Sequence, residues 1–88
     1  MTVARFPNSI SLYDSDCRVV RFAAIVGNET IACAISTEAL TDHFENDPQR
    51  PAMVFARHRS AIEGIADKLI TGRRFEPDGS ILIRTADC

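Results

Sequence analysis

The sequence is poor in several residue types. It has no tryptophan and one tyrosine. Its four glycines and four prolines are too few for a low-complexity or collagen-like chain. No apolar run approaches the roughly 20 residues that cross a bilayer, and no apolar stretch near the N-terminus resembles an export signal. We therefore expect a cytoplasmic protein that has no membrane partner.

The three cysteines do not form a recognisable pattern. Cys17, Cys33 and Cys88 are odd in number and have no CxxC spacing. This argues against a disulfide framework and favours a reducing compartment. Cys33 lies in an apolar run, where burial disfavours the thiolate, so we interpret it as a small core residue and not as a nucleophile.

Size and charge limit the function further. A chain of 88 residues buries enough surface for one modest core, so we expect a single domain over residues 1–88. Ten basic and twelve acidic side chains give a formal net charge of −2. That balance argues against a domain whose main partner is the phosphate backbone of nucleic acid.

Residues 18–35 predict a β-hairpin. Two apolar runs flank Gly27-Asn28, and glycine at the first of two loop positions suits a type II′ turn because it tolerates a positive φ. This turn pairs Val26 with Glu29 and sets the register of both strands. The register places one set of apolar residues on the buried face, namely Val20, Phe22, Ala24, Ile31, Cys33 and Ile35.

Two helices follow in the sequence. Ser36 is a preferred N-cap residue, so a first helix is predicted after it and is expected to end at residues 46–48. A second, longer helix is predicted over residues 51–71, because its first residue is proline and Gly72 suits the position after a helix end. The apolar stripe of this helix contains Phe55, Ile62, Ile65, Ala66 and Leu69.

A last strand is predicted near the C-terminus. Pro77-Asp78-Gly79 is typical of a turn, and Ile81 and Ile83 after it lie on one face of a strand. A short extended piece near Ile10–Tyr13 would add an edge strand. The order of three strands, two helices and one strand predicts an α+β two-layer sandwich, in which a small, mainly antiparallel sheet packs against two helices.

Sequence motifs of enzymes are absent. The chain has no phosphate-binding loop, dinucleotide-binding glycines, nucleophile elbow or HExxH motif. His43 lies near Asp42, Glu45 and Asp47, but a transition-metal site needs a further pair of ligands that the sequence does not offer. The sequence therefore predicts no metal, no cofactor and no catalytic residue.

The densest basic cluster suggests an alternative function. Arg57, Arg59, Arg73 and Arg74 lie in or after the second helix and would be the contacts of a nucleic-acid-binding regulator. On a helical wheel Arg57 and Arg59 are about 160° apart, and Glu63 is placed to pair with Arg59. We therefore do not favour nucleic acid over a protein partner.

The pattern of the whole chain resembles a known family. F-x(15)-F-x(4)-G-x(3)-I-x-C-x-I-S-x-x-A-L, F-x-x-x-R-x-x-I-E-x-x-A and D-G-x-I are similar to the pattern of the bacterial domain of unknown function 1488, or DUF1488. The matching residues are Phe6, Phe22, Gly27, Ile31, Cys33, Ile35, Ser36, Ala39, Leu40, Phe55, Arg59, Ile62, Glu63, Ala66, Asp78, Gly79 and Ile81. The resemblance rests on the order and spacing of these pieces together.

The resemblance implies a small cytoplasmic α+β protein of proteobacteria and offers no activity to transfer. Arg59 and Glu63 match the family pattern without an obvious packing role, so we take them with His58 as the candidate functional surface. The leading hypothesis is a non-enzymatic interaction or regulatory module that binds a protein partner or a second copy of itself, because a short sheet must present or cover an edge strand. A nucleic-acid-binding regulator and a small enzyme with a site near His58, Arg59 and Glu63 are the alternatives.

Overall fold

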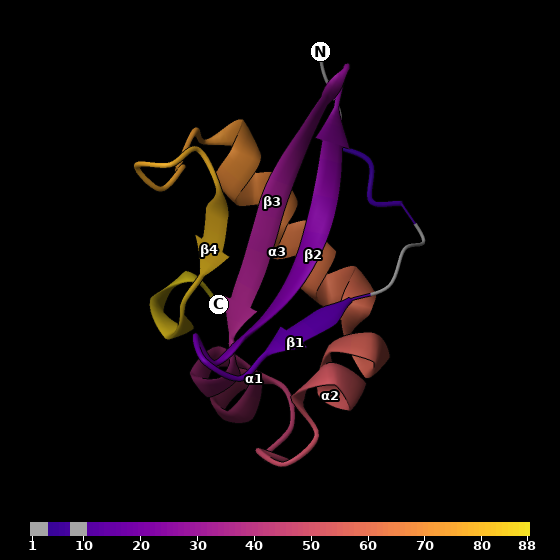
Figure 1. Cartoon of the computed structure of the whole chain (residues 1–88), viewed down its shortest axis with the longest axis vertical. Coiled ribbons are helices and arrows are strands. Elements are labelled where there is room, and N and C mark those ends of the chain that lie inside the picture. The colour runs from indigo at the N-terminus through magenta and orange to yellow at the C-terminus, as the bar shows by residue number, and fades with distance from the viewer. Residues whose placement is uncertain (1–3, 8–10) are drawn as a thin grey trace.

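A computed structural model describes residues 4–7 and 11–88. Within these residues it contains a four-stranded sheet, three α-helices and a short 3₁₀ helix (Figure 1). In chain order the elements are β1 (Leu12–Asp14), β2 (Val19–Val26), β3 (Glu29–Ser36), α1 (Thr37–His43), α2 (Pro51–Arg57), α3 (Arg59–Thr71), β4 (Ile81–Ile83) and η1 (Thr85–Asp87). This composition confirms the predicted α+β fold.

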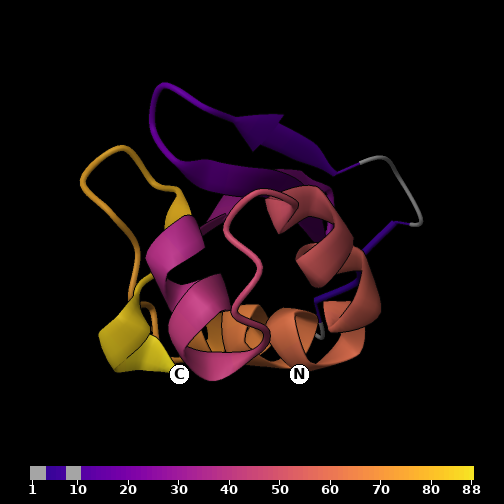
Figure 2. The same cartoon turned by 90° about the horizontal axis from the view of Figure 1, so that it is seen from below.

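The sheet and the helices form two layers. The strands follow the order β1-β2-β3-β4, and the helices lie on one side of them (Figure 2). β1–β2 and β2–β3 are antiparallel, whereas β4 returns after the helices and pairs parallel to β3. The predicted N-terminal edge strand corresponds to β1, and its first expected residue, Ile10, lies outside the described residues.

The hairpin of β2 and β3 has the predicted register. Val26 lies opposite Glu29, and Phe22 lies opposite Cys33. Gly27 has a φ of 62°, while its neighbour Asn28 is not in the left-handed region, as a type II′ turn requires. The turn residues and the alternation of side chains therefore specify the same pairing.

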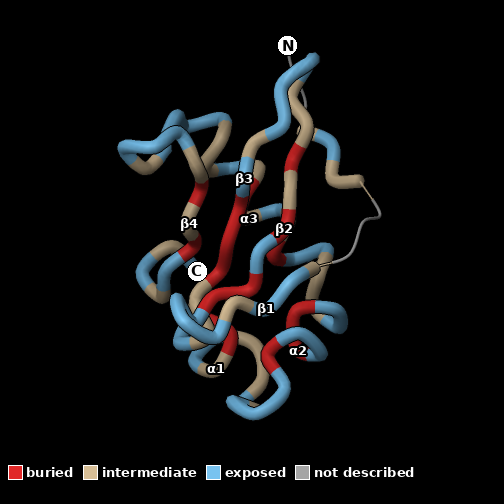
Figure 3. Tube along the Cα trace, viewed as in Figure 1, coloured by how far each residue is buried: buried red, intermediate tan, exposed pale blue. Residues whose placement is uncertain are grey.

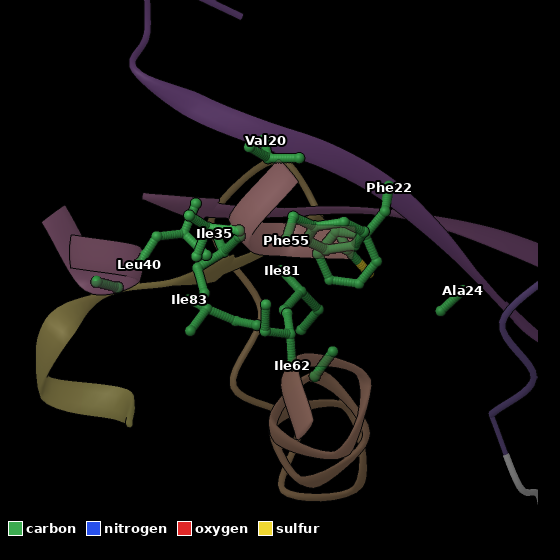
Figure 4. Packing of buried hydrophobic residues seen from close by; sticks show 13 residues of the cluster. Val20, Phe22, Ala24, Ile35, Leu40, Phe55, Ile62, Ile81 and Ile83 are labelled. Atoms are coloured by element: carbon green, nitrogen blue, oxygen red, sulfur yellow. The ribbon is translucent and has the colours of Figure 1, made fainter. Parts of the chain in front are cut away.

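Buried residues occur along β2, β3 and β4 and in the helices (Figure 3), and their side chains pack together between the sheet and the helices (Figure 4). The Phe55 ring of α2 packs against the Phe22 ring of β2, with 5.0 Å between their centroids. The fully buried apolar side chains come from both layers and include Val20, Ile35, Leu40, Val54, Phe55, Ile62, Ile81 and Ile83. Each of the strands β2, β3 and β4 thus contributes the alternate residues of one face.

Helix α1 begins as predicted and ends early. The Ser36 hydroxyl accepts a hydrogen bond from the Ala39 backbone N–H at 3.1 Å, which is the N-cap contact expected from the sequence. The helix ends at His43 and not at residues 46–48, because Phe44 leaves the helical conformation. The segment after it turns back toward α2.

The prediction of one helix over residues 51–71 is wrong. His58, with φ −113° and ψ 22°, separates α2 from α3. α2 contacts β1 and β2, whereas α3 contacts β4, so the break lets two short helices follow different strands. The side chain of His58 is bonded to Glu45, which lies 13 residues earlier. A helical wheel contains no information about such a contact.

Helix α3 is the longest helix of the described chain and keeps the predicted apolar stripe. Ile62 and Ala66 are buried, and Ile65, Leu69 and Ile70 pack partly buried against the core. Among the helices built from the described residues, none has the length and apolar character needed to span a membrane.

We expect Phe55→Ala to lower the free energy of unfolding by about 3–5 kcal/mol, because it removes a fully buried ring from the centre of the core. Urea denaturation followed by circular dichroism measures this change. The matched control is Met53→Ala in the same helix, where the side chain is 40% exposed and the expected loss is below about 1 kcal/mol. Equal losses in the two variants would contradict the assignment of Phe55 to the core.

Candidate functional site

Arg59 and Glu63 form one local structure on α3. Arg59 Nε donates to Glu63 Oε2 at 2.9 Å, one helical turn away. Arg59 Nη2 also donates to the Pro7 carbonyl oxygen at 3.0 Å, and its guanidinium lies 5.7 Å from the centre of the Phe55 ring. Arg59 therefore connects Pro7 to the start of α3. The sequence alone did not reveal this structural role.

His58 belongs to a different cluster. Its Nε2 donates to Glu45 Oε2 at 2.9 Å, and its ring lies 5.3 Å from the Phe44 ring. Arg57 Nη1 donates to the other oxygen of Glu45 at 3.0 Å. Although His58 and Arg59 are neighbours in sequence, their side chains bind partners in different parts of the molecule. The structure thus joins Arg59 to Glu63 and leaves His58 with Glu45.

Glu45 holds the junction of α2 and α3 in place electrostatically. The hydrogen bond from His58, followed by that from Arg57, lowers the pKa of the Glu45 carboxyl from its usual value of 4.5. The carboxylate therefore remains ionised over a wider pH range than a free glutamate. The sequence analysis considered Glu45 only as a neighbour of His43 and missed this role, because Arg57 and His58 are distant along the chain.

The four arginines of the nucleic-acid alternative fall into two groups. Arg57 and Arg59 lie at the α2–α3 junction, and each is in a salt bridge with a glutamate. Arg73 and Arg74 follow the opposite end of α3, a helix of 13 residues and so about 20 Å long. The structure does not gather these residues into one basic patch.

The cysteines and the possible metal ligands lie apart. Cys33 is buried, and desolvation raises the pKa of its thiol to about 11, whereas Cys17 and Cys88 are exposed. No three His, Cys, Asp or Glu side chains converge as a metal site within residues 4–7 and 11–88.

An open strand edge is the feature that sequence reasoning did not locate. β3 has eight residues, but β4 pairs only with Cys33–Ile35. On the side of β3 away from β2, no strand of the described structure is paired with residues 29–32. The other long strand, β2, is paired with β1 at one end and with Arg5 at the other.

The backbone groups of Thr30 point to this open edge. On the far side of β2, Ile25 exchanges two hydrogen bonds with Arg5, at 2.8 and 2.7 Å. Ile25 of β2 and Thr30 of β3 therefore form a non-hydrogen-bonded pair. It follows that the Thr30 N–H and C=O are directed away from β2, toward the edge that β4 does not reach.

The loop before β4 folds back on itself and does not continue the β4 pairing along this edge. The Glu76 N–H donates to the Ser80 carbonyl and the Gly79 N–H donates to the Glu76 carbonyl, both at 2.8 Å. Asp78 accepts hydrogen bonds from the backbone N–H and the hydroxyl of Ser80. In Figure 1 this closed loop extends to the side of the sheet, away from the upper part of β3.

Two hollows flank the open edge. One, of about 480 Å³, lies between residues 29–32 and the loop residues Phe75 and Asp78–Ser80. The other, of about 580 Å³, lies toward the helices and is lined by Ile31, Ile70, Phe75 and neighbouring residues. Both include Phe75, whose side chain is 40% exposed. Backbone donors and acceptors, an aromatic ring and concave surface thus occur together at the edge of β3.

Comparison with known proteins identifies the family. The model of the family described as protein of unknown function DUF1488 matches residues 5–83. The chain belongs to the DUF1488 family. A crystal structure of a DUF1488 protein of unknown function from Shewanella loihica PV-4 has a TM-score of 0.78 to this chain at 24% identity, covering 92% of this chain and 91% of that one. No curated protein matches the chain.

The DUF1488 assignment confirms the resemblance that the sequence pattern indicated, and the S. loihica structure shows the same fold. The family description assigns no activity, so a function has to be inferred from the structure itself. In retrospect the sequence contained one signal for the open edge, since the last apolar run, Ile81–Ile83, is much shorter than β3.

We expect Glu45→Gln to destabilise this DUF1488 protein at neutral pH, with a difference from wild type that shrinks as the pH falls. A carboxyl whose pKa is lowered by folding stabilises the native state above the unfolded pKa and loses that effect as the pH drops through the folded value. Urea unfolding at several pH values from 7 down to below about 4 measures the difference. Asp42→Asn, in an exposed position of α1, is the control, and a difference independent of pH would contradict the role of Glu45.

We expect Arg59→Ala to loosen the segment that precedes β1. The hydrogen bond from the Arg59 guanidinium to the Pro7 carbonyl is a charged one and so among the stronger ones. Its loss should free the neighbouring Arg5, whose carbonyl accepts from the Ile25 N–H, and the Ile25 amide should exchange with deuterium roughly tenfold faster. Hydrogen exchange measured by NMR tests this. Arg50→Ala, which removes an exposed salt bridge with Asp47, is the control and should leave the Ile25 exchange rate unchanged.

Proposed function

We propose that this DUF1488 protein is a non-enzymatic interaction module that binds a protein partner through the open edge of β3. The single observation that supports the proposal is the mismatch between β3, with eight residues, and its partner β4, with three. The mismatch leaves the N–H and C=O of Thr30 and the N–H of Ala32 beside concave surface. An unpaired edge of this kind is a template for another extended chain.

The other edges of the sheet support the choice of this one. β1 is a short edge strand, and the Asp14–Arg21 salt bridge of 3.0 Å lies beside it. Charged groups and short strands are the usual means of keeping an edge unpaired. β3, in contrast, is one of the two longest strands of the sheet, and Phe75 beside its open edge offers apolar contact area.

A cytoplasmic location is part of the proposal. Cys17, Cys33 and Cys88 are all free in the structure, and Cys17 and Cys88 are exposed to solvent. Exposed free thiols persist most readily in a reducing compartment, which supports the cytoplasm.

A pair of substitutions at Thr30 tests the proposal. Thr30→Pro removes the N–H that points to the open edge and is tolerated at strand edges, whereas Thr30→Val keeps this N–H and the β-branched shape. We expect the wild type and Thr30→Val to retain the same partner in affinity capture from lysate of the cells that express the protein, and Thr30→Pro to lose it. Mass spectrometry identifies the retained proteins.

Self-association is tested in the same series. Light scattering at tens of micromolar would detect a dimer, and a dimer abolished only by Thr30→Pro would support binding through this edge with a second copy as the partner. Equal capture by all three proteins, or no specific capture together with a monomer, would overturn the proposal. Thermal melting monitored by circular dichroism shows whether both variants are folded.

A further inference from the structure

We infer that the partner segment at the open edge of β3 is an extended peptide with apolar side chains on one face and basic side chains on the other. This inference rests on the proposed interaction function and specifies the chemistry of the partner. It follows from the backbone groups of the edge, from the apolar hollow beside it and from the charges around both.

The backbone of the edge requires an extended partner. The Thr30 N–H and C=O point to the open side. Ala32 has the same orientation, but the pairing of Cys33 with Ile81 uses its C=O for β4 and leaves its N–H. A helix has no free backbone groups along its length and cannot supply matching acceptors and donors. A strand supplies both at the same two-residue spacing, so strand addition satisfies the edge.

The hollow on the helix side determines the apolar positions of the peptide. In a sheet, the residue next to Ile31 in an added strand directs its side chain to the same face as Ile31. That side chain would enter the hollow of about 580 Å³, between Ile31, Ile70 and the Phe75 ring. All three are partly exposed in the structure, so an apolar side chain gains free energy by covering them.

The charges around the two hollows favour a basic peptide. Glu29, Asp67 and Asp78 line them, against the single cation Arg73. Glu29, Asp67 and Asp78 have no salt bridge in the described part of the chain. Arg21 lines a neighbouring hollow with Asp78 and interacts with it electrostatically, but the salt bridge of Arg21 is with Asp14. The hydrogen bonds from Ser80 lower the pKa of the Asp78 carboxyl, so this group stays ionised at neutral pH. Lysine or arginine on the solvent-facing side of the peptide would meet Asp78.

The same charges argue against a second copy as the occupant. Two copies paired edge to edge would bring two sets of Glu29 and Asp78 side chains together, and like charges across neighbouring strands are destabilising. The open stretch is also only four residues long, at 29–32, which limits the overlap of two folded sheets more than it limits a flexible peptide.

A direct binding experiment tests the inference. The probe is the fluorescein-labelled peptide acetyl-KVKIRVK-amide, whose apolar and basic residues alternate, and the matched control is acetyl-EVEIEVE-amide. We expect the basic peptide to bind the wild type and Thr30→Val alike by fluorescence anisotropy. Its affinity should fall at least about tenfold for Thr30→Pro and about threefold for Asp78→Asn, as expected for lost backbone hydrogen bonds and a lost partly exposed charge contact.

A second measurement does not depend on the variants. In a two-dimensional NMR titration of the wild type, the basic peptide should shift the Thr30 and Ala32 amides and slow the hydrogen exchange of the Thr30 amide. Failure of the basic peptide to bind, equal binding of the acidic peptide, or shifts confined to other residues would overturn the inference.

The two proposals fail in different ways. If the captured partner depends on the Thr30 N–H but is not displaced by the basic peptide, the interaction function stands and the inferred chemistry is wrong. If the protein dimerises through β3, the interaction function also stands, and the heterologous basic segment is wrong. If capture is indifferent to Thr30→Pro, the interaction function itself fails.

Discussion

The turn at Gly27 is the constraint on which the rest of the structure depends. Because Gly27 adopts a φ of 62° at the first position of a two-residue loop, the strands on either side of it can pair in only one register. That register places the apolar residues of both strands on one face, where the helices and Phe55 pack. It also decides which backbone groups of β3 point away from β2, and so it defines the open edge at Thr30.

Tertiary contacts, and not local propensity, determine how the helices cover this face. His58 interrupts a segment whose sequence suits a continuous helix, and Glu45 binds both His58 and Arg57 at the interruption. Arg59 holds the other side of the junction through Glu63 and the Pro7 carbonyl. These polar contacts let α2 follow β1 and β2 while α3 runs toward β4.

How well each element could be predicted from the sequence depends on how far apart its contacting residues lie along the chain. The hairpin register and the Ser36 cap could be predicted because both arise from residues close together in the sequence. The break at His58 could not, since the contact made by its side chain at the break is with Glu45, 13 residues away. The open edge could not be located either, because it depends on how far β4 reaches along β3 and on the internal bonds of the loop at Glu76.

The end of α3 explains why the edge stays open. The Arg74 N–H donates to the Leu69 carbonyl and the Arg73 N–H to the Ile70 carbonyl, with Arg73 in the left-handed region at a φ of 56°. A residue with a Cβ pays about 1 kcal/mol or more in this conformation, which glycine would avoid. This turn directs the chain into the closed loop and places Phe75 in the wall of both hollows. The strained helix end, the self-bonded loop and the short β4 therefore act together to keep part of β3 available.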